Sequence, residues 1–426
     1  MLILGTIMDS RTPIKKLSIV LFSIPLLLAC DSNGGLIDSD NVENIREYIE
    51  KLATDLNLDL ALPEPILVEI ITDTTAKPDT EQNTGTPITI NGVAGNHNKQ
   101  AAIIADNEIN LARVSCGLNA LSSDPELENI AIAHANYIQH VYANATPTVY
   151  DAHSQSKIDD IATVTGESNP FFTGASLGDR LSNTGYSNVA YGVAENIAQS
   201  IYFNSIGDLL TPDVATLSMT KSLLAAPYHL RALMIPSSIL SGTGVAAYKP
   251  YGKGANNNQG YVLVNNAAAT IATRNTSFEG IFTYPCQGVT DTVTALYNES
   301  PDPFRGARNL QANPIGQPIY VNVPSANTIK LSNVSLFDIE RNSEVPVQLL
   351  DADQDPYKGT NYQLPANEAF ILPLTDELES CEHRPKIGQN CGLYGNTQYR
   401  ISFDILIDNN VSKRQSFTFK TGEVSY

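Results

Sequence analysis

Near residue 314 the pattern of apolar residues changes from a mixture of helical and strand-like periods to short strands alone. Beyond that point, apolar runs alternate with turn residues, which is typical of an antiparallel β-sandwich of roughly a hundred residues. We therefore predict an all-β sandwich over residues 314–426. Its expected strands are residues 318–323, 328–337, 345–350, 369–373, 398–406 and 415–420.

The region before the sandwich, residues 105–290, carries both kinds of pattern. Its clearest helix is expected over residues 125–143, where Asp124 can cap the helix, Pro125 suits the first turn and apolar residues recur on one face. Helices mixed with a few separated strands indicate an α+β layer fold. The other expected helices are residues 107–121, 217–224 and 228–234, and the expected strands are residues 193–200, 244–248 and 261–265.

Residues 30–104 form a mixed extension. Residues 41–58 are compatible with one amphipathic helix and residues 63–71 with a strand. Residues 72–99 are rich in Thr, Asn, Gly and Pro, which is the composition of a linker. We expect this extension to join the amino terminus to the α+β region.

The amino terminus has the layout of an export signal. Lys15 and Lys16 precede an apolar run that is short for a transmembrane helix. The run ends in LLAC at residues 27–30, which resembles the bacterial lipobox. This resemblance implies that residues 1–29 are removed and that Cys30 is lipidated, which would anchor the chain to an inner or outer membrane of the cell envelope. The alternative is an ordinary secretory signal followed by a coincidental cysteine.

The charge of the chain limits its partners. Residues 1–29 contain three basic residues and one acidic residue, so their removal takes the formal net charge from −19 to −21. A surface this acidic repels phosphate backbones, which argues against nucleic acid as a partner. It also repels anionic lipid headgroups, so membrane attachment should come from a lipid chain rather than from a basic patch.

Four further cysteines remain, at Cys116, Cys286, Cys381 and Cys391. Four thiols in an exported chain suggest two disulfides. A bridge between Cys381 and Cys391 would close a short loop, and Cys116 and Cys286 would then join the start of the α+β region to its end. Four cysteines allow three connectivities, and the sequence alone does not choose among them.

Several short motifs follow one another between residues 107 and 268. They combine an opening helix with Asn and Arg, a second helix with His-Ala, separate His and Glu-Asn positions, and a closing His…Pro…Gly-x-Gly-Val stretch. The residues are, in order, Asn110, Arg113, Leu127, Ala131, His134, Ala135, His153, Phe172, Gly174, Arg180, Gly185, Tyr186, Glu195, Asn196, His229, Pro236, Gly242, Gly244 and Val245.

In this order the motifs resemble the CAP superfamily, which comprises cysteine-rich secretory proteins, antigen 5 and pathogenesis-related proteins and is also known by its SCP domain. The resemblance covers under half of the chain and implies a CAP-type α-β-α sandwich with a central cavity. Two histidines and two glutamates line that cavity in many members and can bind a divalent metal, usually zinc. His153, Glu195 and His229 match three of them here. No residue matches the second glutamate, and Leu230 stands where the family often has arginine.

The matched residues permit two readings. Two imidazoles and one carboxylate can hold zinc in three positions and leave a fourth open for water. Alternatively, His153, Glu195 and His229 form a hydrogen-bonded cluster that supports the loops over the cleft. His134 lies on the apolar face of its expected helix, so we expect a core histidine with a local partner.

Two other patterns resemble functional motifs but lack necessary parts. Residues 174–178 match a nucleophile elbow with Ser176 at its centre, but the residues before it have no strand pattern. Asp351, Asp353 and Asp355 begin like a calcium loop, which then lacks the sixth-position glycine and the twelfth-position glutamate. We expect neither to be a site.

Together these features predict a lipid-anchored protein of the bacterial cell envelope that faces the periplasm or the cell exterior. Its CAP-like domain is expected to bind a lipid, a peptidoglycan component or a protein. The carboxyl-terminal region ends in Phe-x-Phe-x-Thr-Gly, which resembles the last strand of bacterial Ig-like modules and implies a spacer or adhesion unit. No nucleophile accompanies a base in a complete motif, so binding is favoured over catalysis. The alternatives are a metal-assisted envelope hydrolase that uses His153, Glu195 and His229, and a purely adhesive or structural surface protein.

Overall fold

The computed structural model describes residues 85–188, 192–203, 210–252, 258–381 and 390–424. The chain divides into two units, Met1–Thr80 and Glu81–Tyr426, and the elements below all belong to the second. Cys30 with the predicted signal peptide, the predicted helix over 41–58 and the predicted strand over 63–71 lie outside the described residues. Within the described ranges, no helix is long and apolar enough to cross a membrane.

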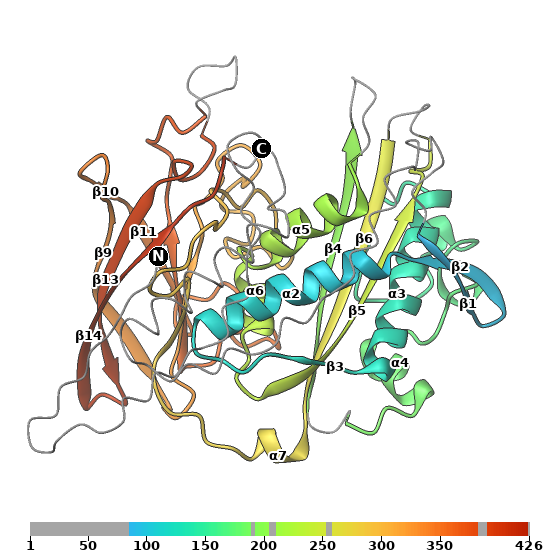
Figure 1. Cartoon of the computed structure of the whole chain (residues 1–426), viewed down its shortest axis with the longest axis horizontal. Coiled ribbons are helices and arrows are strands. Elements are labelled where there is room, and N and C mark those ends of the chain that lie inside the picture. Colours follow the sequence, from blue (N-terminus) through green and yellow to red (C-terminus); the bar gives the residue numbers. More distant parts are fainter. Residues whose placement is uncertain (1–84, 189–191, 204–209, 253–257, 382–389, 425–426) are drawn as a thin grey trace, which may run out of the picture. The chain divides into compact units, whose positions relative to one another are not determined.

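A four-stranded mixed sheet forms the centre of the α+β half (Figure 1). Its order is β3 (Ser122–Ser123), β5 (Ser238–Tyr248), β6 (Asn258–Ala269) and β4 (Val193–Phe203). β3 runs parallel to β5, whereas β6 pairs antiparallel with both of its neighbours. Every residue of β6 is buried, so the sheet is covered on both faces.

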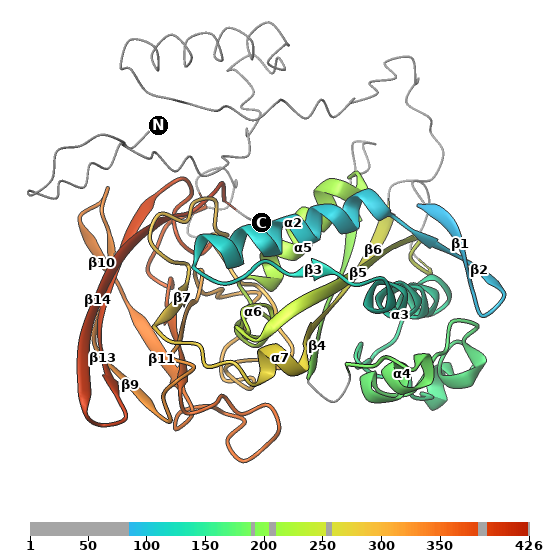
Figure 2. The same cartoon turned by 60° about the horizontal axis from the view of Figure 1, so that its bottom comes forward.

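Helices cover the two faces of this sheet in separate layers (Figure 2). They are α2 (Lys99–Ser115), α3 (Pro125–Asn144), α4 (Leu177–Thr184), α5 (Pro212–Leu223) and α6 (Pro227–Leu233). Val245 and Ala247 of β5 pack in an apolar cluster with α2, α5 and α6, whereas Ala246 and Tyr248 pack in a cluster with α3. Because successive strand residues point to opposite faces, α2, α5 and α6 form one layer and α3 lies in the other.

Local signals explain where α3 begins and how closely it packs. The Asp124 side chain accepts hydrogen bonds from the backbone nitrogens of Glu126 and Leu127, at 2.9 and 3.1 Å, so it caps the helix as predicted. β5 then passes directly over α3 at its two glycines. A Cβ atom at Gly242 or Gly244 would overlap the backbone of α3. The Gly-x-Gly motif therefore permits close contact between a strand and a helix.

The Asn…Arg motif of α2 also has a structural role. Both the amide nitrogen and the side-chain oxygen of Asn110 bond the backbone of Leu121, at 3.0 and 2.7 Å. The buried Arg113 guanidinium donates hydrogen bonds to four backbone carbonyls at the ends of α2, α6 and β5. These carbonyls belong to Asn119, Leu233, Ile235 and Ser238. Arg113 thus joins three segments through backbone contacts.

Two antiparallel four-stranded sheets form the carboxyl-terminal sandwich. One has the order β10 (Ser343–Val345), β9 (Ile329–Asp338), β13 (Gln398–Ile407) and β14 (Val411–Lys420). The other has the order β11 (Val347–Asp351), β12 (Glu368–Pro373), β8 (Ile319–Asn322) and β7 (Phe282–Tyr284). Leu336, Ile401, Phe403, Val321 and Ile371 are among the side chains that fill the space between them.

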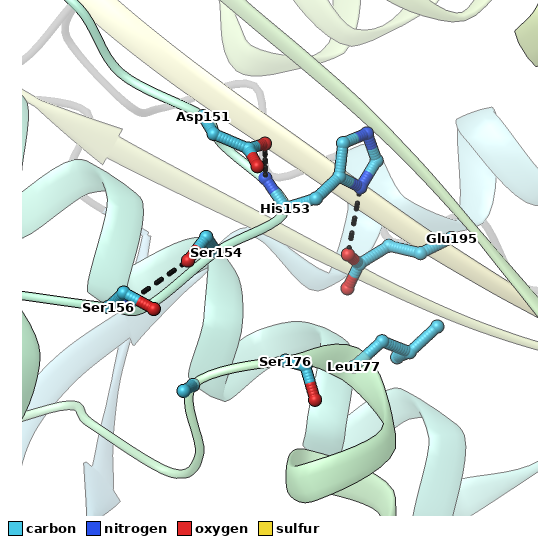
Figure 3. Close-up of a pocket in the computed structure, with 8 residues that line it drawn as sticks. Asp151, His153, Ser154, Ser156, Ser176, Leu177 and Glu195 are labelled. Atoms are coloured by element: carbon cyan, nitrogen blue, oxygen red, sulfur yellow. Dashed lines mark hydrogen bonds and ion pairs between the residues drawn. The ribbon is translucent and has the colours of Figure 1, made fainter. Parts of the chain in front are cut away.

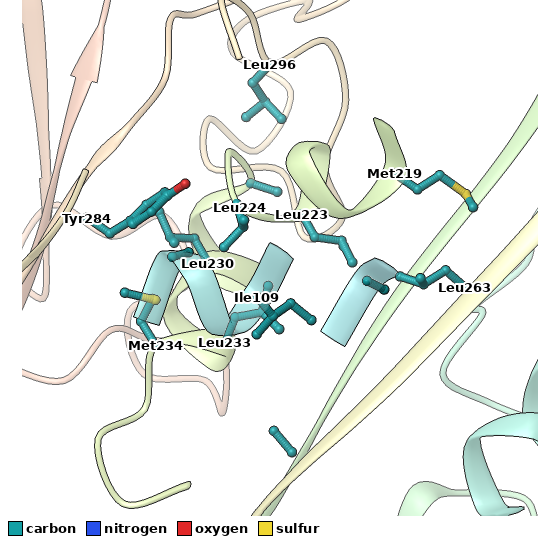
Figure 4. Close-up of a cluster of buried hydrophobic side chains, with 14 of the residues drawn as sticks. Ile109, Met219, Leu223, Leu224, Leu230, Leu233, Met234, Leu263, Tyr284 and Leu296 are labelled. Atoms are coloured by element: carbon teal, nitrogen blue, oxygen red, sulfur yellow. The ribbon is translucent and has the colours of Figure 1, made fainter. Parts of the chain in front are cut away.

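The second of these sheets is buried on both faces. Val321 and Ile371 pack inside the sandwich, whereas their neighbours Tyr320 and Phe370 belong to the apolar cluster of α2, α5 and α6. Figure 4 shows part of this shared cluster, in which Tyr284 lies among side chains from the helices. One apolar cluster therefore extends from the helices to the outer face of this sheet, and a second cluster fills the sandwich.

The predicted fold class is confirmed: an α+β half with a mixed sheet between helices precedes an antiparallel β-sandwich. Several predicted boundaries were wrong: the expected helices 107–121 and 217–224 are Lys99–Ser115 and Pro212–Leu223, and the expected strands 244–248 and 261–265 are Ser238–Tyr248 and Asn258–Ala269. The first helix begins at Lys99 rather than residue 107, and the end of the expected linker forms a hairpin of β1 (Thr86–Ile90) and β2 (Val93–His97). The run 345–350 is two strands in different sheets, β10 and β11, because Pro346 cannot donate a ladder hydrogen bond.

The domain boundaries remain predictions. Strand β7 comes from the region assigned to the first domain, but it pairs with β8 of the sandwich. Short helical segments complete the described chain: η1 (Asp159–Ile161), η2 (Gly166–Ser168) and α7 (Ile271–Arg274).

The structure chooses one of the three disulfide connectivities. Cys116 pairs with Cys286 and Cys381 pairs with Cys391, with Cα–Cα separations of 5.5 and 5.1 Å. The first bridge joins the end of α2 to the residues that follow β7 and closes a long loop, which is the type expected to restrict the unfolded chain most. Two disulfides suit a protein that functions in an oxidising compartment outside the cytoplasm.

Candidate functional site

The loop after α3 is held against that helix by Gln155, which is fully buried. Its side-chain oxygen accepts hydrogen bonds from the backbone nitrogens of Thr173 and Gly174, at 2.8 and 3.3 Å. Its amide nitrogen donates to Nδ1 of His134 at 2.8 Å. Gln155 therefore links α3 to the end of this loop, just before α4.

These contacts also determine the protonation of His134. Nδ1 accepts from Gln155, so the ring hydrogen lies on Nε2, which donates to the carbonyl of Ala152 at 2.9 Å. Complete burial lowers the pKa of His134 to about 4, so the ring is neutral at pH 7. His134 is the core histidine with local partners that the helix pattern predicted.

Glu195 is the buried acidic group of the site. It lies on β4 with its side chain only 2% exposed, and Nη2 of Arg180 donates to its two oxygens at 2.8 and 2.6 Å. Arg180 comes from α4 and is itself fully buried. Nδ1 of His153 donates to Oε1 of Glu195 at 3.0 Å, and Nη1 of Arg180 donates to the backbone carbonyl of His153. One guanidinium thus holds both the carboxylate and the loop above it.

The carboxylate of Glu195 is ionised. Burial alone would raise its pKa, but the charge interaction with His134, the hydrogen bond from His153 and the charge of Arg180 together lower the pKa to about 2. His134 is neutral at pH 7, so we attribute the persistent stabilisation of the anion to Arg180 and His153. Glu195 and Arg180 together form an ion pair without net charge beneath His153.

An open cleft of about 390 Å³ lies next to this ion pair and is lined by Glu195. Figure 3 shows His153 and Glu195 pointing toward each other on one side and the Ser176 to Leu177 turn on the other. The His153 side chain is 44% exposed, so its imidazole can contact a ligand. Hydroxyl groups dominate the remaining polar lining. The lining residues are Asp151, His153, Ser154, Ser156, Ala175, Ser176, Leu177 and Glu195.

His229, on α6, lies beside His153. Its ring stacks near the ring of His153, with 6.4 Å between the centroids and 24° between the planes. Nδ1 of His229 lies 3.5 Å from Oε1 of Glu299, a buried acid in the segment between β7 and β8. The structure therefore brings together the three residues that the resemblance selected, with His153 beside both of the others.

This arrangement does not supply the three zinc ligands that the resemblance implies. Arg180 occupies both oxygens of Glu195, and its positive charge opposes a second cation at the same carboxylate. The Nδ1 atoms of His153 and His229 face the carboxylates of Glu195 and Glu299, so the Nε2 atoms of the two rings are the ring nitrogens left to coordinate a metal. Throughout the described part of the chain, no group of three or more His, Cys, Asp or Glu side chains could hold a metal. The geometry favours the alternative reading, a hydrogen-bonded cluster under the cleft.

The two incomplete motifs have structural explanations. Ser176 caps α4: its hydroxyl accepts from the backbone nitrogen of Asp179 and donates to the Asp179 carboxylate at 2.8 Å. Asp351 accepts hydrogen bonds from the backbone of its own turn, and the oxygens of Asp355 accept from Tyr357, Leu364 and the hydroxyl of Tyr228. Neither residue set resembles an active site.

Sequence reasoning missed three important residues of the site. Arg180 was part of the resemblance but was given no role; its position in the motif was the available signal. Gln155 follows His153 by two residues, and nothing in its neighbourhood indicated its buried contacts. Glu299 lies outside the segment that resembles the family, so no motif could have connected it with His229.

No protein-family model matches the chain, and no curated protein sequence does. Among solved structures, the chain is similar to CopC from Methylosinus trichosporium OB3b, with 8% sequence identity over 34% of this chain and 92% of that chain. The TM-score of this similarity is 0.18, and at that value the likeness supports no inference about fold or ligand. The resemblance to the CAP superfamily therefore rests on the sequence motifs.

Proposed function

We propose that this chain is an envelope lipoprotein with a CAP-like α+β half that binds a ligand in the cleft above Glu195. The observation that carries the proposal is a half-exposed imidazole, His153, fixed by a buried carboxylate that is already neutralised by Arg180. Buried polar groups of this kind hold a side chain in one orientation for recognition. No serine or cysteine of the cleft is activated by a base in the described structure, which favours binding over hydrolysis.

The lining of the cleft favours a polar ligand. Its hydroxyls and its imidazole can bond sugar hydroxyls and peptide amides, and Ala175 and Leu177 are the two aliphatic residues among those that line it. Among the envelope ligands that the sequence left open, we therefore propose a peptidoglycan fragment that carries both glycan and peptide.

Titration calorimetry with muropeptides tests this proposal on the full chain. We expect His153→Ala to weaken the Kd by about tenfold or more, which corresponds to about 1.4 kcal/mol. His140→Ala is the matched control, because His140 lies on α3 and does not line the cleft. Equal binding by wild type and His153→Ala would exclude this cleft. Absence of muropeptide binding at millimolar concentration would exclude the ligand class and leave a lipid, a protein or a purely adhesive role.

We also propose that Cys30 carries the lipid anchor, because the LLAC sequence at residues 27–30 ends the apolar run and the two disulfides suit an exported protein. Globomycin blocks the lipoprotein signal peptidase and should leave the precursor uncut. Cys30→Ser should abolish labelling with a radioactive fatty acid, whereas Ser32→Ala should keep it. Normal cleavage in globomycin, or a labelled Cys30→Ser variant, would contradict lipidation.

A further inference from the structure

Glu299 is a buried acid that faces His229, whose ring stacks beside the His153 ring of the cleft. Its side chain is fully buried, its Oε1 atom accepts a hydrogen bond from the backbone nitrogen of Tyr228 at 2.7 Å, and the same atom lies 3.5 Å from Nδ1 of His229. Burial raises the pKa of Glu299, and its contacts with His229 oppose that rise. Among the described residues, His229 is the side chain that forms an ion pair with Glu299.

The two carboxylate–imidazole pairs differ in their charge. Arg180 neutralises Glu195, so the Arg180–Glu195 pair beneath His153 has no net charge. The contact with Glu195 places a ring hydrogen on Nδ1 of His153, and a ring with that single hydrogen has Nε2 as a hydrogen-bond acceptor.

In the part of the chain that the structure describes, no arginine forms an ion pair with Glu299. Because a net charge is costly to bury, the pair of Glu299 and His229 favours one additional proton. That proton can lie on the carboxyl group or on Nδ1 of His229. In either position the Nε2 atom of His229 keeps its own hydrogen and remains a donor.

We propose that Glu299 is a positioning residue that makes His229 a hydrogen-bond donor in the cleft, while the adjacent His153 is an acceptor. The inference rests on the proposed ligand cleft and narrows its ligand. A ligand group that both donates and accepts hydrogen bonds, such as a sugar hydroxyl or a secondary amide, can form a hydrogen bond with each of the two rings. A carboxylate or a metal ion satisfies only one of them.

The β-sandwich holds this second pair in place. The hydroxyl of Tyr228, the residue before His229, donates to Asp355 at 3.1 Å, and Nε of Arg231 donates to Glu368 at 2.6 Å. Both acids belong to the sandwich region, near the start of the β11–β12 connection and on β12. These contacts with the sandwich region help to fix α6, which carries His229.

Nitrogen-detected NMR of the imidazole rings in the full chain tests the proposal. We expect Nε2 of His229 to be protonated and Nε2 of His153 to be unprotonated at pH 7.5, in spectra assigned through bonds from the backbone. This measurement needs no variant and no ligand, so it can fail while the proposed binding function stands. The same protonation pattern on both rings would overturn the assignment.

Glu299→Gln provides the second measurement. The substitution keeps the size and the acceptor for Tyr228 but removes the charge, so the nitrogen resonances of His229 should shift while those of His153 stay in place. Muropeptide affinity should fall by about tenfold. Glu344→Gln is the control, because Glu344 is exposed and bonds only the hydroxyl of Ser335 among the described residues. Unchanged His229 resonances in a folded Glu299→Gln variant would refute the role of Glu299, and if that variant does not fold, the wild-type spectrum decides alone.

Discussion

Arg180→Met is expected to lower the free energy of unfolding by about 3–5 kcal/mol, because it leaves the carboxylate of Glu195 buried without its positive partner. Both side chains are almost completely buried, so solvent cannot replace the guanidinium. Urea denaturation followed by circular dichroism measures the change. The matched control is Arg414→Met in the exposed pair with Asp404, which should cost at most about 1 kcal/mol.

The same variant should show a characteristic dependence on pH. The pKa of Glu195 is lowered from its usual value of 4.5 to about 2, so its contribution to stability is present above pH 4.5 and is lost as the pH falls toward 2. Without Arg180 the carboxylate is no longer favoured over the acid. The stability difference between wild type and Arg180→Met should therefore be largest near pH 7 and should shrink below pH 4.5.

Adding Glu195→Gln to Arg180→Met should recover part of the lost stability, because the double variant has no unpaired buried charge. A loss in Arg180→Met no larger than that of Arg414→Met, or a loss that does not change with pH, would show that the buried ion pair does not stabilise the site.

Arg113→Met is expected to cost about 3–5 kcal/mol for a different reason. The guanidinium donates to four backbone carbonyls, at 2.9, 2.7, 3.1 and 2.8 Å, and each carbonyl left unpaired in the interior costs about 1–3 kcal/mol. Burial lowers the pKa of Arg113 to about 10, so the charge persists at pH 7 and relief of its desolvation offsets part of the loss. Urea denaturation again provides the measurement.

Arg400→Met is the control for Arg113. Arg400 is exposed on β13, where its guanidinium lies 5.0 Å from the ring centre of Phe337, so its loss should cost about 1 kcal/mol or less. Arg113→Lys should be intermediate, because an ammonium group keeps the charge but cannot reach carbonyls in three directions. Equal stability of the Arg113→Met and Arg400→Met variants would show that Arg113 does not join α2, α6 and β5.

The fold class could be predicted because it depends on local patterns. The helix α3 was located from a cap, a proline and an apolar stripe, all within its own residues, and Asp124 does cap it. The strands β9 and β13 alternate between the sandwich interior and solvent, so their period was visible as well. The start of α2 was missed because the composition of residues 72–99 suggested a linker.

The limits of sequence reasoning are clearest at Pro346. A continuous apolar run contains β10 and β11, and only pairing with distant strands assigns them to different sheets. The burial of both faces of β12 has the same origin, because one face meets the sandwich and the other meets the helices. Such partners are separated by long stretches of chain, so the local pattern of apolar residues does not reveal which strands pair.

The candidate site divides in the same way. By itself, the sequence determined the order of most helices and strands and the choice of His153, Glu195 and His229 as residues to examine. Only the tertiary structure decided what these residues do. Arg180 neutralises Glu195, and Glu299 faces His229 from 70 residues further along the chain. The protonation of a buried side chain depends on the charges within a few ångströms, and these are set by folding rather than by neighbours in the sequence.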